Sequence, residues 1–122
     1  MKKSQVVNVM LLGVSNNGSN TTSYAWILTP QSFSMGGGSG VTECTIVYLL
    51  DTNVPGATFS ADTMASLPPD ADIHVADHVI VVTCSNDGLT SSQQYSYTLY
   101  ANVPELEDPL VHDPEFTLQP PG

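Results

Sequence analysis

The sequence predicts an all-β protein, an immunoglobulin-like β-sandwich of about six or seven strands. Runs rich in valine, isoleucine, threonine and tyrosine recur along the chain, and such residues favour strands. Glycine, proline, asparagine and aspartate separate the runs at short intervals, which is typical of sandwiches. The length of 122 residues suits one domain, residues 1–122, around a single core.

The most regular stretch is 78–103, where two strand-like runs flank Asn86-Asp87-Gly88. The first run, HVIVVTCS, is apolar at positions of both parities, which predicts a strand covered on both faces. Asp-Gly between two such runs predicts a central β-hairpin, because glycine adopts the positive φ that the turn requires. The second run alternates, and one of its sides carries Tyr95, Tyr97, Leu99, Ala101 and Val103.

Residues 5–14 and 23–29 predict the first two strands. The first is apolar on both faces, and the second places Trp26 on an apolar side, where we expect it to anchor the core. Pro30 should end the second strand, because proline has no amide hydrogen for the ladder. Between the two strands, Asn17-Gly18 predicts a tight turn.

The first residues, MKKSQVVNVMLLGVS, have the outline of a signal peptide: two lysines, a short apolar run, then small residues. Asn8 interrupts the apolar run, which favours a retained first strand and leaves an export signal as the alternative. No stretch approaches the roughly 20 apolar residues of a membrane span. We therefore expect a cytoplasmic protein.

Residues 41–50 predict a third strand, with Cys44, Ile46 and Tyr48 on one face. The glycine run at 35–40 is expected to be a loop and not a phosphate cradle, because a P-loop ends in Lys-Ser/Thr and leads into a helix.

The next segment is less regular. Residues 57–59 suit a short strand, and 60–67 are the one place where a helical turn is expected, with a serine as its N-cap. Residues 70–77 are expected to form an irregular bridge. Near the C-terminus, 115–119 predict an edge strand with alternate side chains inward.

The ending VHDPEFTLQPPG, which comes after a tyrosine-rich strand, resembles the close of small bacterial β-sandwich proteins of the DP-EP family. It is also similar to the AidA/PixA inclusion-body proteins, whose last strand begins near an Asp-Pro. The matching residues are Asp113, Pro114, Phe116 and Leu118. The resemblance implies a sandwich fold, and it brings no catalytic residues because the DP-EP family has no assigned activity.

The charge balance excludes two classes of partner. Twelve acidic residues face two lysines and no arginine, and the net charge is −10. Nucleic acids and anionic membrane surfaces both attract cationic side chains, which this chain almost lacks. We expect it to bind neither.

Metal and catalytic chemistry receive little support. His74 and His78 would lie about 13 Å apart on one strand, too far to share a metal ion. No GxSxG elbow is present. We therefore assign no catalytic, cofactor-binding or metal-binding residues and expect a protein that is not an enzyme. The other residues considered as metal ligands are Asp70, Asp72, Asp77, His112 and Asp113.

Cys44 and Cys84 lie 40 residues apart in apolar strands, and no CxxC motif is present. Buried free thiols are the expected state in the cytosol. A disulfide between two sheets, as in immunoglobulin domains, is the alternative.

These observations predict a non-enzymatic structural or interaction protein that binds a protein partner or associates with itself. The alternative is a module that binds a small ligand or a carbohydrate. Aromatic side chains distinguish the two, because sugars stack on exposed rings. The candidates for such a platform are Trp26, Tyr95, Tyr97 and Tyr100.

Overall fold

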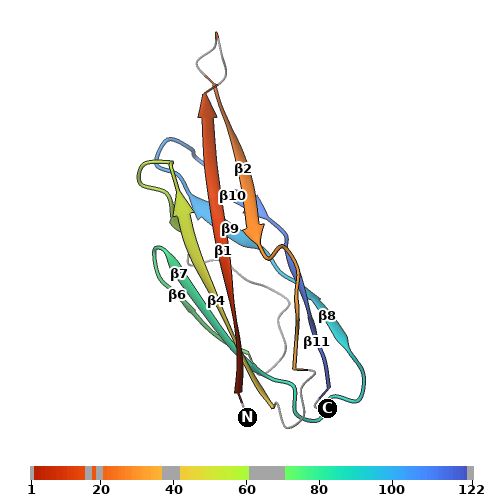
Figure 1. The fold of residues 1–122 in the computed structure, drawn as a ribbon. Coiled ribbons are helices and arrows are strands. Elements are labelled where there is room, and N and C mark those ends of the chain that lie inside the picture. The colour runs from red at the N-terminus through yellow and green to blue at the C-terminus, as the bar shows by residue number, and fades with distance from the viewer. Residues whose placement is uncertain (1, 16–17, 19–20, 37–41, 61–70, 121–122) are drawn as a thin grey trace.

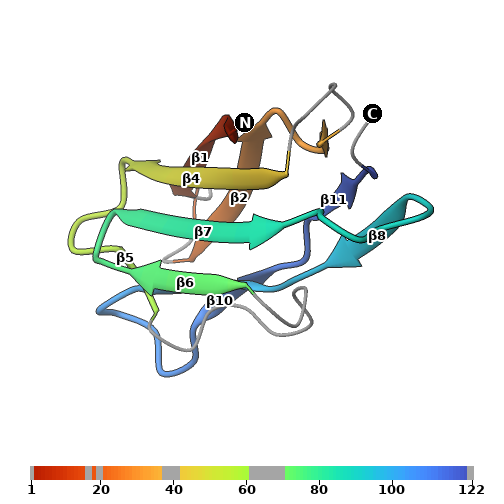
Figure 2. The same cartoon turned by 90° about the horizontal axis from the view of Figure 1, so that it is seen from below.

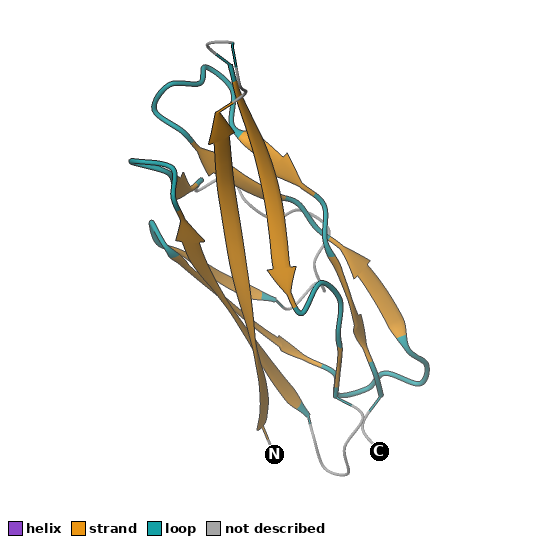
Figure 3. Cartoon of the chain, turned by 45° about the horizontal axis from the view of Figure 1, so that its top comes forward, coloured by secondary structure: helices purple, strands orange, loops and turns teal. Residues whose placement is uncertain are grey.

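The structure is a computed structural model that describes residues 2–15, 18, 21–36, 42–60 and 71–120. Every regular element among these residues is a β-strand, which confirms the all-β prediction (Figure 3). No helix in the described ranges has the length and apolarity to cross a membrane.

Eleven strands succeed one another along the described chain, several of them only two to four residues long. They are β1 (Lys2–Ser15), β2 (Thr22–Thr29), β3 (Ser34–Met35), β4 (Glu43–Thr52), β5 (Thr58–Phe59), β6 (Asp72–Val75), β7 (Val79–Ser85), β8 (Gln93–Ser96), β9 (Leu99–Asn102), β10 (Leu110–His112) and β11 (Glu115–Leu118).

One large sheet has the order β2-β1-β4-β7-β6. Two smaller sheets have the orders β10-β9-β5 and β3-β11-β8. In the large sheet β1 runs antiparallel to β2 but parallel to β4, and the remaining pairs are antiparallel. Figure 1 shows β1 as the longest strand, with β2 beside it and the described ends of the chain at the same end of the molecule.

The main core lies between the large sheet and the two small ones, so the arrangement fits a β-sandwich (Figure 2). Alternation along the strands explains how this core forms, because every second side chain of each strand points to the same face. The large sheet contributes Val7, Val9, Leu28, Cys44, Ile46, Tyr48, Ile80 and Val82. The small sheets contribute Met35, Phe59, Leu99, Phe116 and Leu118.

The predicted hairpin over 78–103 is wrong, although its turn is real. Gly88 has a φ of 85°, as an Asp-Gly turn requires. The strands on either side do not pair, however: β7 lies between β4 and β6, and β8 pairs with β11. Both edges of β7 are occupied by other strands, so the chain crosses from the large sheet to the opposite layer after the turn.

The second run of that stretch keeps its predicted alternation but is divided between two sheets. Its inward side chains are buried or half-buried, as expected. β8 belongs to the sheet with β11, whereas β9 belongs to the sheet with β10 and β5.

Two other predictions need correction. The segment 70–77 contains a regular strand, β6, in which Ile73 and Val75 point inward between exposed Asp72 and His74. β11 does bury Phe116 and Leu118, but it is the central strand of its sheet and not an edge.

The first three predicted strands are confirmed as β1, β2 and β4, and the side of β2 that carries Trp26 faces inward as predicted. The short strand at 57–59 is confirmed as β5. The helical turn expected at 60–67 and most of the glycine run lie outside the described residues, as does Asn17. The next element after the glycine run is strand β4 and not the helix that a P-loop needs.

Candidate interaction surface

The large sheet has a second face, turned away from the core, and this face is rich in apolar side chains. We call it the outer face and define it by the outward residues of β1, β2, β4 and β7. Its most exposed apolar members are Val6 (47%), Met10 (37%), Val14 (58%), Ile27 (48%) and Leu49 (37%). Its other apolar members are Leu12, Ala25, Val47, Val79 and Val81.

The strand register makes these side chains neighbours. Met10 lies opposite Ile27, and Leu12 lies opposite Ala25. Val6 pairs with Val47, which in turn pairs with Val81 on β7. Side chains that lie opposite each other on adjacent strands are about 5 Å apart at Cβ and therefore touch. The apolar residues thus form short rows: one joins Val6, Val47 and Val81, and another joins Ile27 to Met10 and ends at Asp51 of β4.

Carboxylates lie towards the border of the outer face. Glu43 and Asp51 lie near the two ends of β4, where Asp51 is opposite Met10, and Asp72 lies on edge strand β6. Asn8 is the polar residue in the middle rows of β1, beside Leu49. An apolar centre within a polar border is the composition that protein interfaces show.

The signal for this face was present in the sequence. The strand 5–14 is apolar at both parities, and so is the run that became β7. For the latter, this pattern predicted a strand covered on both faces. Among the described residues only the inner face is covered: Ile80 and Val82 are fully buried, whereas Val79 and Val81 are half-buried.

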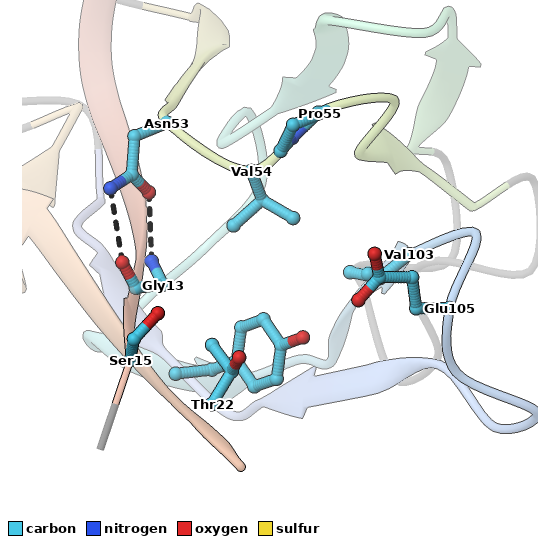
Figure 4. Close-up of a pocket in the computed structure, with 9 residues that line it drawn as sticks. Gly13, Ser15, Thr22, Asn53, Val54, Pro55, Val103 and Glu105 are labelled. Carbon is cyan, nitrogen blue, oxygen red and sulfur yellow. Dashed lines mark hydrogen bonds between the residues drawn. The ribbon is translucent and has the colours of Figure 1, made fainter. Parts of the chain in front are cut away.

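A cavity of about 250 Å³ lies near the tip of the β1–β2 pair (Figure 4). Thr22, Tyr24, Val54 and Glu105 are among the residues that line it. Its wall is held by Asn53, whose Oδ1 accepts a hydrogen bond from the Gly13 amide (2.8 Å) and whose Nδ2 donates to the Gly13 carbonyl (3.0 Å). The amide side chain therefore pairs with the end of β1 as another strand would.

A second cavity, of about 320 Å³, lies beside His112 and Asp113. The His112 ring stacks on Trp26, with centroids 5.6 Å apart. Asp113 accepts a hydrogen bond from the Thr98 hydroxyl at 2.9 Å. The side chains of His112 and Asp113 are thus both held by other residues of the chain, and they form a polar wall of the cavity.

The candidate aromatic residues for a sugar platform are buried or half-buried. Tyr97 is buried against Tyr48 and Phe116, and Tyr95 packs on Phe116. Trp26 is half-buried and stacked on a histidine. Tyr100, on β9, is half-buried too, and none of the four residues belongs to the outer face of the large sheet.

The residues considered above as possible metal ligands lie apart from one another. His74 on β6 pairs with Asp72 at 3.2 Å, while His78 lies in the turn before β7. Asp70 lies outside the described residues, and His112 belongs to the opposite layer. In the described part of the chain, no three histidine, cysteine or acidic side chains come together as metal ligands would.

The two cysteines are buried on neighbouring strands of the same sheet, and no disulfide joins them. The inter-sheet bridge of immunoglobulin domains is therefore ruled out, because Cys44 and Cys84 face each other across β4 and β7. Burial raises the pKa of the Cys44 thiol, an effect that Lys3 offsets and Glu43 reinforces. A protonated, buried thiol is a poor nucleophile.

Comparison with protein-family models found no matching family, and comparison with curated proteins found no match.

Proposed function

We propose that the chain is a non-enzymatic interaction protein and that the outer face of its large sheet is the contact surface for another protein. One observation carries the proposal: strands apolar on both faces have only one face covered by the described chain. Apolar surface of the outer face that stays in water costs about 25 cal/mol for each Å². Association with another protein would recover this free energy.

The chemistry of the buried groups supports a role in binding. The cysteine thiols face each other in the core, and the two histidines of the 70–78 region do not converge. Unbridged thiols at facing positions also support a reducing, cytoplasmic location. We further propose that the fold is immunoglobulin-like and related to the DP-EP family, supported by the burial of Pro114, Phe116 and Leu118 at the Asp-Pro ending.

A small-ligand module is the second candidate, and the cavity at Tyr24 and Glu105 favours it. Hydroxyl groups, one carboxylate and the apolar Val54 would suit a small polar ligand. Magnetic resonance spectra of the labelled protein with a fragment library test this role. Shifts confined to Thr22, Tyr24 and Glu105 would support it.

The interaction role is tested by photo-crosslinking in cells. A benzophenone amino acid at Ile27, exposed on the outer face, should give a discrete protein adduct. The matched control carries the same group at Gln94, exposed on β8 in the opposite layer. Equal adducts at both positions, or none at Ile27, would contradict the proposal.

A further inference from the structure

We infer that the partner on the outer face is a second copy of this chain, packed face to face about a two-fold axis. This inference rests on the proposed function, because it names the protein that covers the same surface. Two properties of the face support it: its area and its charge.

The area suits a stable dimer. Strands β1, β4, β2 and β7 contain 14, 10, 8 and 7 residues, and each residue occupies about 16 Å² of a sheet, from the rise along a strand and the spacing between strands. The flat footprint is therefore roughly 600 Å², and side-chain relief enlarges its accessible surface. A standard-size interface buries about 800 Å² on each partner. The outer face alone can supply nearly all of that area.

The charge distribution favours a copy over a basic partner. A chain with a net charge of −10 repels its own copies at most surfaces. The row through Val6, Val47 and Val81 carries no carboxylate, so two copies can meet there without burying like charges. A basic protein would instead bind the carboxylates that lie outside this face, such as those of Glu105 and Asp108.

The two copies can meet about a two-fold axis that lies between their outer faces. An axis perpendicular to the strands sets the two sheets antiparallel. Two sheets stacked in this way keep the separation of about 10 Å that sandwiches use.

The test is the mass of the purified, full chain in solution, measured by sedimentation equilibrium up to about 100 μM, where interfaces of this size are occupied. The chain should have twice its 13.0 kDa mass. Added salt should strengthen the dimer, because it screens repulsion between two chains of charge −10. A monomer throughout that range would overturn the inference.

Three variants locate the interface. Ile27→Glu and Val6→Glu should each weaken the dimer by about a hundredfold, because each buries an unpaired charge. Val111→Glu is the matched control: it adds the same charge at a valine that is 51% exposed on β10, in the opposite layer. If Val111→Glu dissociates the dimer as strongly as the other two variants, the interface lies elsewhere and the inference fails.

The two proposals fail in different ways. A monomeric purified chain that still gives an adduct at Ile27 in cells, with a mass other than twice that of the chain, would overturn the self-association and keep the interaction role. A monomeric chain with no adduct at Ile27 would overturn both.

Discussion

Gly36 and Asn86 meet so closely that no side chain fits between them. Asn86 is fully buried, and its Nδ2 donates hydrogen bonds of 3.0 Å to the carbonyl oxygens of Gly36 and Gln119. Gly36 has a φ of 90°, and a Cβ at this position would collide with the Asn86 amide. This contact joins the end of β7 to both strands β3 and β11 of the opposite layer.

Gly36→Ala should therefore lower the free energy of unfolding by about 3 kcal/mol or more, since it adds a steric clash to the cost of a positive φ. Gly88→Ala is the control, because Gly88 also has a positive φ (85°) but open space around it. That substitution should cost only about 1–2 kcal/mol. Urea denaturation of both variants gives the comparison, and equal costs would show that the Asn86 contact is unimportant.

Phe116 joins β11 to its neighbours through three aromatic contacts. Its ring lies 5.6 Å from those of Phe33 and Tyr95 and 6.0 Å from that of Tyr97. Phe116→Ala should lower stability by about 3–5 kcal/mol, as large core truncations do. Glu115→Ala, at the exposed neighbouring position, should change it by less than about 0.5 kcal/mol. Identical melting temperatures for the two variants would mean that the C-terminal strand is dispensable.

Tyr48 and Tyr97 should make the protein sensitive to alkali. Burial raises the pKa of both hydroxyls, and the neighbouring Tyr97 adds to the shift at Tyr48. Because the folded pKa values exceed the unfolded value of about 10, the stability linked to the neutral hydroxyls is complete below that pH. This stability is lost as the pH rises towards the pKa values of the two hydroxyls in the folded state. Denaturation curves from pH 8 to 11 should show this loss, and the double variant Tyr48→Phe/Tyr97→Phe should reduce it. An unchanged alkaline slope in that variant would assign the loss to other groups.

The facing cysteines give a chemical test of the core. Cys44 and Cys84 are buried and not joined by a disulfide, so a thiol reagent should modify both in denaturant without reductant. The folded protein should react far more slowly, because burial also raises the pKa of the Cys44 thiol. Finding no reactive thiol in denaturant would indicate a cross-strand disulfide and an oxidising compartment.

Much of the fold could be predicted from local patterns. Alternating side chains identified the inward faces of β2 and β11, because every second side chain of a strand points to the same side. Strand pairing could not be predicted in the same way. The Asp87-Gly88 turn suggested a local hairpin with the residues that follow it, but β7 pairs instead with β6, which precedes it directly, and with β4, which comes from a distant part of the chain.

The candidate surface was present in the sequence but was misinterpreted. Apolar residues at both parities indicate a strand that avoids water on both sides, and the pattern cannot distinguish cover by the same chain from cover by another one. Likewise, Asp72 and His74 made 70–77 appear irregular, although they are the exposed half of an alternating strand. The protein that covers the outer face decides the first case, and pairing with the neighbouring strand β7 decides the second.

Oxidation of Met10 measures most directly whether another protein covers the outer face. Met10 is 37% exposed on this face, between Ile27 and Asp51, whereas Met35 is buried in the core and serves as the internal reference. In intact cells treated with hydrogen peroxide, peptide mass spectrometry should find Met10 oxidised nearly as slowly as Met35. The purified Ile27→Glu chain at high dilution should oxidise rapidly at Met10 only. Equal rates for Met10 in cells and in the diluted variant would contradict the account, because the outer face would then be open to water where the protein works.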